Sequence, residues 1–361
     1  MSSDQEKLSV IRDKIDKIDV QLQELISERA QCAMEVAEIK VAAGDTNFYK
    51  PEREAQILRA IKERNTGPLN GNDMARLFRE IISACLALEQ PMKIAFLGPE
   101  GTYTQSAAFK HFGHAVTGAP LAAIDEVFRE VEAGSADYGV VPIENSTEGM
   151  VNQTLDMFAR SPLTICGEVE LRIHHQLLSK NKAIKDISKV FSHQQTFAQC
   201  REWLGLNLAG VEHFVVSSNS EAARLAAETK NSAAIAGEVA AEIYGLNILE
   251  KNIEDEPDNT TRFLVVGKQN PLPSGSDKTS LIIYGNNKPG SLYSILEPLS
   301  KNGVSMSRIE SRPSRKGTWD YIFFIDLDGH HQDDKVAKAL QEMKDNAISI
   351  KLLGSYPKAL N

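Results

Sequence analysis

The spacing of apolar residues in this chain of 361 residues changes abruptly at Pro91. Residues 6 to 90 carry apolar residues at the three- and four-residue steps of helices, with breaks near residues 44–50 and 65–72. From Lys93 onward, short apolar runs typical of strands alternate with helical segments. Because a helical spacing does not suit a strand, we expect an all-α domain followed by α/β units.

The domain boundaries follow from these changes. Helices at 6–43, 51–64 and 73–90 form a predicted first domain, residues 1–91. A predicted α/β domain spans residues 92–268, with strands at 93–97, 138–143, 189–191, 214–217, 233–236 and 262–266. A linker containing proline and glycine covers residues 269–277.

The last domain, residues 278–361, has the order of a ferredoxin-like α+β fold. Its predicted elements are a strand at 279–284, a helix at 291–302, strands at 304–310 and 321–327, a helix at 333–345 and a strand at 348–353.

The composition excludes several classes of protein. The chain has 40 Lys and Arg against 49 Asp and Glu, a net charge of −9, which argues against nucleic acid and anionic membranes as partners. No apolar run approaches the ~18 residues of a membrane span, and the polar start is not a signal peptide. The four cysteines lie far apart and the eight histidines lack metal-ligand spacing. We therefore expect a cytoplasmic protein without a metal site.

The apolar stripe of the first helix is interrupted by a cation. The stripe recurs in steps of three and four at Leu8, Ile11, Ile15, Ile18, Leu22, Leu25, Cys32, Val36 and Ile39. Arg29 occupies the missing position, Lys40 lies on the same face eleven residues later, and Arg12 flanks the stripe nearer the N-terminus. In the third helix, Glu89 continues the apolar face four residues after Cys85.

One charge on such a stripe can set the register of a coiled coil or reach out to solvent. Three cations against one acid instead favour a buried anionic ligand. Arg12 and Arg29 lie ~25 Å apart along a straight helix, too far for one small ligand to contact both. We therefore expect an obligate homodimer in which Arg12 of one chain reaches Arg29 of the other. The sequence leaves open whether dimers pair into tetramers.

Residues 6–90 resemble the all-helical chorismate mutase domain in Arg12, in Arg29 followed by Lys40, in Pro51-Glu52-Arg53-Glu54 and in Leu88-Glu89-Gln90. This family converts chorismate to prephenate in a pericyclic step that needs no cofactor, only positioning and stabilisation of the ether oxygen. The resemblance implies that Lys40 and Glu89 contact the ether oxygen and Glu54 the ring hydroxyl. It also implies substrate contacts from Arg12 of the partner chain, Arg29, Arg53 and Cys85.

Two residues depart from the pattern of this family. Lys50 stands where many members have an acid, so the contact with the ring hydroxyl rests on Glu54. Glu89 stands where many members have glutamine, and a carboxylate repels an ether oxygen unless it is protonated. Burial would raise the pKa of Glu89, so we expect mutase activity to rise as the pH falls.

Three strand-to-helix turns of the second domain are polar: Gly98 to Thr104, Glu144 to Gly149 and Ser192 to Gln195. In a parallel α/β sheet such turns gather at one edge, where helix N-termini bind carboxylates. Each turn alone is more often a simple helix cap, but three in one domain favour a small di-acid as the ligand. The Gly98 turn lacks the spacing of a dinucleotide or Walker loop, so we expect no nucleotide cofactor.

A fourth polar segment, Asp258 to Phe263, places two threonines and Arg262 at the start of a core strand. A turn with a surface ion pair is the alternative interpretation. The segments Pro142 to Ser146 and Asn259 to Phe263 together resemble the prephenate dehydratase family, and the likeness covers residues 93–267.

That family has a two-lobed α/β domain similar to the periplasmic binding proteins, with the site between the lobes. It converts prephenate to phenylpyruvate with loss of CO₂ and water. The resemblance implies that Thr261 hydrogen-bonds the leaving hydroxyl. It also implies substrate contacts from Thr102, Glu144, Asn145, Ser146, Ser192, Gln199 and Arg262. Gln194 stands where the family often has proline, outside these roles.

The last domain resembles the ACT domain of the same enzymes in Lys288 to Leu292 and Arg308 to Pro313, although a proline-glycine pair before a helix is common by itself. The resemblance implies that phenylalanine binds between paired domains and inhibits the dehydratase. The implied contacts are Pro289, Gly290, Ser291, Leu292, Glu310, Ser311, Arg312 and Pro313.

In this order, the three domains resemble the bifunctional chorismate mutase/prephenate dehydratase family of phenylalanine biosynthesis. A non-catalytic small-molecule sensor is the alternative, against which the inward Arg29, Lys40 and Glu89 argue. A mutase fused to prephenate dehydrogenase is disfavoured, because no Gly-x-Gly-x-x-Gly follows a strand.

Overall fold

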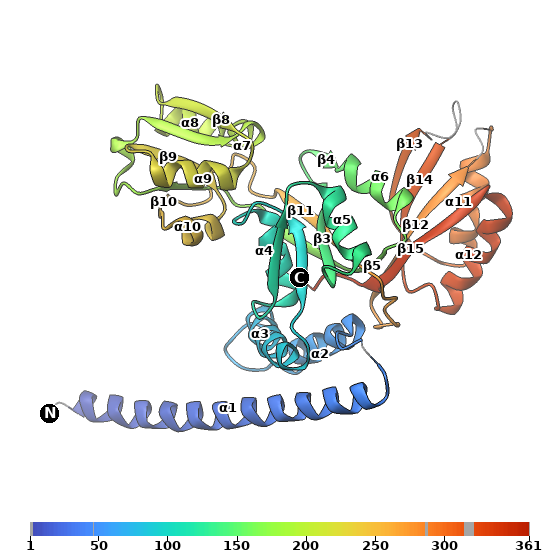
Figure 1. Cartoon of the computed structure of the whole chain (residues 1–361), viewed down its shortest axis with the longest axis horizontal. Coiled ribbons are helices and arrows are strands. Elements are labelled where there is room, and N and C mark those ends of the chain that lie inside the picture. Colours follow the sequence, from blue (N-terminus) through green and yellow to red (C-terminus); the bar gives the residue numbers. More distant parts are fainter. Residues whose placement is uncertain (1–2, 46, 286–287, 314–320, 361) are drawn as a thin grey trace.

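The computed structural model describes residues 3–45, 47–285, 288–313 and 321–360. Its elements form a helical N-terminal domain, two α/β lobes and a C-terminal α+β domain (Figure 1). The fold class expected from the sequence is confirmed. Among the described residues, no helix combines the length and the apolar character that a membrane crossing requires.

The N-terminal domain consists of α1 (Ser3–Ala42), α2 (Pro51–Arg64) and α3 (Gly71–Glu89). Proline opens α2, and the Asn70 side chain accepts a hydrogen bond from the Asp73 N–H to cap α3. Helices α2 and α3 pack together around Leu58 and Ile61. The C-terminal half of α1 contacts α3, and its N-terminal half extends past both helices (Figure 1).

The apolar stripe of α1 is uncovered in the single chain. Leu8, Ile15 and Leu22 are 52%, 50% and 51% exposed. Since apolar surface of this extent is unusual on a monomer, the helix presents a face suited to another chain.

The first lobe is built on a six-stranded sheet of order β2-β1-β3-β11-β5, with β4 paired to β3. Its strands are β1 (Lys93–Leu97), β2 (Thr117–Leu121), β3 (Tyr138–Asn145), β4 (Gly149–Met150), β5 (Thr164–Arg172) and β11 (Thr260–Gly267). Its helices are α4 (Tyr103–Phe112), α5 (Ile124–Ala133) and α6 (Asn152–Arg160). Strand β1 is parallel to β2 and β3, whereas β11 is antiparallel to β3 and β5.

The second lobe is built on a five-stranded sheet of order β10-β6-β9-β7-β8. Its strands are β6 (Gln176–Ser179), β7 (Lys189–His193), β8 (Glu212–Val216), β9 (Ser232–Ala236) and β10 (Asn247–Glu250). Its helices are a 3₁₀ turn (Ile184–Asp186), α7 (Gln194–Gln199), α8 (Arg201–Asn207), α9 (Asn219–Glu228) and α10 (Glu238–Tyr244). The chain passes between the lobes twice, at residues 173–175 and 251–259, so β11 returns to the first lobe.

The C-terminal domain is an antiparallel sheet of order β13-β14-β12-β15 with two helices. Its elements are β12 (Asp277–Gly285), α11 (Ser291–Lys301), β13 (Met306–Pro313), β14 (Tyr321–Asp328), α12 (Asp334–Asn346) and β15 (Ser349–Pro357). Leu281 and Ile283 of β12 face a core with the helices, whereas Ile282 points the other way.

The second face of this sheet shares a hydrophobic core with the first lobe. Ile282, Phe324 and Leu353 belong to the same buried cluster as Phe158 and Ile165 of the first lobe. The C-terminal domain is therefore covered on both faces, by its own helices and by the lobe (Figure 1).

The backbones of the two domains approach each other closely at Gly354 of β15. A Cβ added there would lie 2.4 Å from the carbonyl oxygen of Ile165, and the glycine has φ +153°. The atoms of Ile165 that this Cβ would meet belong to the backbone and cannot rotate away. We therefore expect Gly354→Ala to separate β15 from β5 and lower the free energy of unfolding by about 1–3 kcal/mol. Urea denaturation of the purified protein measures this loss.

The matched control is Gly205→Ala in α8, where an added Cβ meets nothing within 4 Å. A helix gains slightly from this change, so its unfolding midpoint should stay or rise. Equal losses of unfolding free energy in the two variants would show that the close contact between Gly354 and Ile165 does not stabilise the protein.

Candidate functional site

A group of charged residues lies where α1 contacts α3. Lys40 Nζ is 3.9 Å from Glu89 Oε2 and donates a hydrogen bond to the Phe48 carbonyl oxygen at 3.0 Å. Arg29, half-buried on the same helix, is close enough to act electrostatically on Glu89. Cys85 is buried one turn before Glu89. The structure thus brings Arg29, Lys40 and Glu89 together, as the helical spacing predicted.

Glu89 is the least satisfied member of this group. Its Oε2 atom is buried and has no hydrogen-bond donor among the described residues. Burial raises the pKa of Glu89, and the opposing attraction of Lys40 and Arg29 does not cancel this effect. The direction of the pKa shift expected from the sequence is confirmed.

The other residues predicted for the first domain lie apart from this group. Arg12 is exposed on the free half of α1, and Arg53 is exposed on α2. The Glu54 carboxylate accepts a 3.3 Å contact from Arg79 Nε, and burial raises its pKa although Arg79 opposes the shift. Glu54 was expected beside the substrate, but in the single chain its carboxylate faces the junction of α2 and α3 with the first lobe.

Asn145 and Thr261 form the centre of a second group. They lie directly opposite each other on β3 and β11. Asn145 Nδ2 donates to Thr261 Oγ1 at 2.8 Å and to Asn259 Oδ1 at 2.7 Å. Because Asn145 donates to the Thr261 oxygen, the Thr261 proton is directed elsewhere. The Thr261 hydroxyl can therefore donate its proton to another acceptor.

The second lobe reaches this region through a chain of polar contacts. Glu148, on the turn after Asn145, accepts hydrogen bonds from Gln195 and, at 3.3 Å, from Gln199 Nε2. Gln199 Oε1 lies 2.7 Å from His175 Nε2, and His175 Nδ1 lies 2.8 Å from the Tyr103 hydroxyl. Burial lowers the pKa of His175, so its ring stays neutral. These contacts join both lobes around the turn that carries Asn145.

Three further predicted residues fix the backbone at strand ends. The Ser192 hydroxyl is buried and contacts Asn219 Oδ1 at 3.1 Å and the Ile235 carbonyl at 3.2 Å. Thr102 caps α4 and donates to the Leu97 carbonyl at 3.0 Å. Ser146 accepts a hydrogen bond from the Thr260 N–H at 3.0 Å. Their hydroxyls therefore hold the turns in shape.

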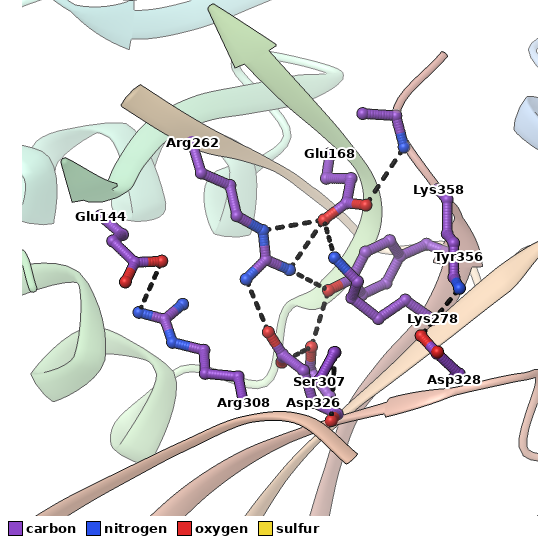
Figure 2. A network of polar contacts seen from close by, with 12 residues as sticks. Glu144, Glu168, Arg262, Lys278, Ser307, Arg308, Asp326, Asp328, Tyr356 and Lys358 are labelled. Carbon is purple, nitrogen blue, oxygen red and sulfur yellow. Dashed lines mark hydrogen bonds and ion pairs between the residues drawn. The ribbon is translucent and has the colours of Figure 1, made fainter. Parts of the chain in front are cut away.

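Arg262 and Glu144 do not join the Asn145–Thr261 group. Side chains alternate along a strand, so each points to the face opposite its neighbour. Arg262 contacts Glu168 at 2.8 Å and Asp326 at 2.6 Å, and Glu144 contacts Arg308 at 3.0 Å (Figure 2). The sequence led us to expect substrate contacts from both residues; the structure instead places their charges at the interface with the C-terminal domain.

The residues predicted for the effector lie on α11 and β13. Gly290 has φ +83° and precedes α11, with Pro289 exposed, Ser291 half-buried and Leu292 exposed. On β13, Glu310 is half-buried, while Ser311 and Pro313 are exposed. Arg312 Nη1 donates to the Asn152 carbonyl oxygen at 3.1 Å and to Asp156 Oδ1 at 2.9 Å. Arg312 is thus bound to α6 of the first lobe.

The structure adds residues that the sequence did not single out as site residues. Asn259 lies two residues before Thr261 on the same segment, and this spacing could have indicated that it shares a face with Thr261. His175, which the sequence did not single out either, connects Tyr103 to Gln199. The described residues contain no group of three or more His, Cys, Asp or Glu arranged to hold a metal ion.

Comparisons with known proteins match all three parts of the chain. Family models match as Chorismate mutase type II over residues 11–90, Prephenate dehydratase over 94–271 and ACT domain over 279–345. A bifunctional chorismate mutase/prephenate dehydratase of Stutzerimonas stutzeri is 54% identical, over 99% of this chain and 100% of the relative.

Two solved structures resemble most of the chain. The prephenate dehydratase of Arthrobacter aurescens in complex with L-Phe is 36% identical, with a TM-score of 0.68 over 74% of this chain and 90% of that one. A protein described as a novel type of quorum quenching acylase is 30% identical, with a TM-score of 0.69 over 74% of this chain and 98% of that one.

Proposed function

Because this chain belongs to the bifunctional chorismate mutase/prephenate dehydratase family and carries an ACT domain, we propose that Arg29, Lys40 and Glu89 form its mutase site and that Asn145 and Thr261 form the centre of its dehydratase site. The observation that supports the first assignment is that two cations, Arg29 and Lys40, act on the half-buried Glu89 carboxylate between α1 and α3. The observation that supports the second is the hydrogen bond from Asn145 to Thr261.

The mutase step breaks an ether C–O bond while a C–C bond forms, and no covalent intermediate is required. Arg29 and Arg12 of the partner chain bind the two carboxylates. Cys85 lines the pocket, and Arg53, which is exposed on α2 in the single chain, joins the pocket in the dimer. Lys40 and protonated Glu89 donate hydrogen bonds to the ether oxygen, on which negative charge develops in the transition state. Glu54, expected from the sequence to contact the ring hydroxyl, is paired with Arg79 in the single chain, and its contact with the substrate stays a prediction.

Protonated Glu89 implies a pH dependence. Its pKa lies above the usual value of about 4.5, so the active form is populated below the raised pKa and is lost above it. Mutase activity should therefore rise as the pH falls, changing by up to ~tenfold per pH unit above the pKa. In Glu89→Gln, which donates at every pH, the kcat profile should be flat. An unchanged profile in this variant would contradict the role of Glu89.

We propose that the active form is a homodimer formed through α1. The exposed stripe of α1 requires a covering surface, and Arg12 is exposed on the half of the helix that extends past α2 and α3 (Figure 1). In a two-fold dimer each chain would supply Arg12 to the site of its partner.

Mixed dimers test this exchange. Arg12→Ala and Arg29→Ala should each inactivate the mutase, because a carboxylate loses its cation. After the two variants are unfolded and refolded together, half of the dimers contain one intact site, so mutase activity should return to about one quarter of the parent value. No recovery, with mixed dimers demonstrated by mass spectrometry, would mean that Arg12 and Arg29 serve the same chain.

The dehydratase step removes the ring carboxylate of prephenate as CO₂. The electrons of the bond between the ring and this carboxylate form a ring double bond as the C–O bond to the hydroxyl breaks. The hydroxyl takes up a proton from the solvent and leaves as water. A threonine is a very weak acid, so Thr261 acts as a hydrogen-bond donor to the departing oxygen, and formation of the aromatic ring drives the reaction. Gln199, Ser192, Thr102 and Ser146 hold the surrounding turns in place.

The decisive experiment supplies chorismate alone to the purified protein and follows prephenate and phenylpyruvate. The parent should form phenylpyruvate without an added cofactor. Thr261→Val removes the donor at nearly constant volume and should lower the dehydratase kcat by about 10²–10³-fold, so prephenate accumulates. Thr260→Val is the control, because the Thr260 hydroxyl donates to the Asp258 carbonyl oxygen at 3.3 Å. Equal rates in both variants would exclude Thr261 as the donor.

We propose that phenylalanine binds the ACT domain at Pro289–Leu292 and Glu310–Pro313 and inhibits the dehydratase. The start of α11 suits its carboxylate, and Glu310 suits its ammonium group. The L-Phe complex of the related A. aurescens enzyme supports this choice of effector. The cytoplasmic location stays a prediction from the sequence.

A further inference from the structure

The two strands that carry Asn145 and Thr261 also carry a second pair of residues on their other face. In the register of β3 and β11, Thr261 lies opposite Asn145, and Arg262 lies opposite Glu144. Each member of the proposed catalytic pair therefore has a charged neighbour, one residue away, that points to the ACT domain (Figure 2).

The ACT domain meets this pair with two charges of its own. Arg308 on β13 lies opposite Asp326 on β14. Asp326 binds Arg262 at 2.6 Å, and Arg308 binds Glu144 at 3.0 Å. The four residues Glu144, Arg262, Arg308 and Asp326, here called the charge quartet, link two pairs of adjacent strands across the domain interface (Figure 2).

The Arg262 half of the quartet is tightly held. Arg262 and Asp326 are 9% and 7% exposed. Arg262 also contacts Glu168 and the Tyr356 hydroxyl, and Asp326 accepts a hydrogen bond from Ser280 at 2.5 Å. Burial opposes both charges, but Arg262 and the Ser280 hydrogen bond lower the pKa of Asp326, so the pair stays ionised. Separating buried charges is strongly unfavourable, so β14 and β11 must shift together.

We propose that Arg262 and Glu144 are positioning residues for the dehydratase, through which the ACT domain sets the relative placement of Asn145 and Thr261. The proposal rests on the assignment of Thr261 as the hydrogen-bond donor. A displacement of β13 against β14 moves Arg308 relative to Asp326. It therefore moves Glu144 relative to Arg262, and with them the neighbouring Asn145 and Thr261.

This arrangement also gives phenylalanine a route to the site. Glu310 to Pro313, proposed to contact phenylalanine, follow Arg308 on the same strand β13. A ligand that favours one position of β13 over another changes the population of the active arrangement by its difference in affinity for the two.

The test uses Arg308→Gln and Asp326→Asn in the full-length protein, because both residues lie in the ACT domain. Asp328→Asn is the control: Asp328 lies on the same strand and pairs with Lys358 near the surface. The measurements are the dehydratase kcat and KM for prephenate, phenylalanine binding by calorimetry and the inhibition at saturating phenylalanine. Mutase activity reports whether each variant is folded.

Arg308→Gln and Asp326→Asn should each lower the dehydratase kcat about tenfold with KM changed less than about twofold, as expected when positioning rather than binding is lost. Both should bind phenylalanine yet lose most of the inhibition, while Asp328→Asn behaves as the parent. If Asp326→Asn does not fold, the test rests on Arg308→Gln. This variant leaves Glu144 unpaired, and Glu144 is less buried than Arg262, the partner of Asp326, so its folding should be less affected.

Parent-like kcat and inhibition in the folded variants would overturn the proposal. A purely structural quartet would lower the unfolding temperature and leave the kcat and the inhibition unchanged, which also overturns it. Thr261→Val separates this failure from that of the catalytic assignment: if Thr261→Val loses the dehydratase and the quartet variants do not, only the coupling is wrong.

Discussion

Strand β11 contacts the neighbouring strands of the first lobe, the Asn145 side chain and the ACT domain. It returns from the second lobe, lies antiparallel between β3 and β5, and is buried from Thr261 to Gly267. Its Thr261 faces Asn145, and its Arg262 faces the ACT domain. Because a strand alternates its side chains between two faces, one short segment serves the proposed reaction on one side and holds the regulatory domain on the other.

The mutase domain is attached to this body by a separate set of contacts. Tyr49, in the segment between α1 and α2, contacts His111 of α4 at 3.0 Å and packs against Phe112 and Tyr138. Burial lowers the pKa of His111 to about 3, so the ring is neutral and acts as part of the core. Helices α2 and α3 are thereby fixed to the first lobe, whereas α1 is exposed along most of its length.

The spacing of apolar residues predicted the helices and strands that have one apolar face and one face toward solvent. The three N-terminal helices and the element order of the ACT domain are confirmed to within a few residues. Strands β2, β4, β5, β6 and β10 were missed, because they are short or mixed with glycine, proline and charge, as in Thr117–Leu121 and Thr164–Arg172. Their pairing comes from neighbouring strands, which a single sequence does not reveal.

The same limit applied to the candidate site. The motif around Asn259 to Phe263 indicated a polar site. The motif alone does not determine which face of the strand each of its residues occupies. Arg262 and Glu144 were therefore assigned to substrate, although the ACT domain covers their face. In the helical domain the spacing of Arg29, Lys40 and Glu89 was sufficient, because one helix face meets one partner helix.

The shared core between the ACT sheet and the first lobe limits how such an enzyme can be divided. The linker at residues 269–277 is a boundary in the sequence, but Ile282, Phe324 and Leu353 pack into the lobe beyond it. A truncation at the linker would expose that apolar surface together with the buried Glu168 and Arg262. A dehydratase fragment that ends there should aggregate, so the first lobe and the C-terminal domain fold as one unit.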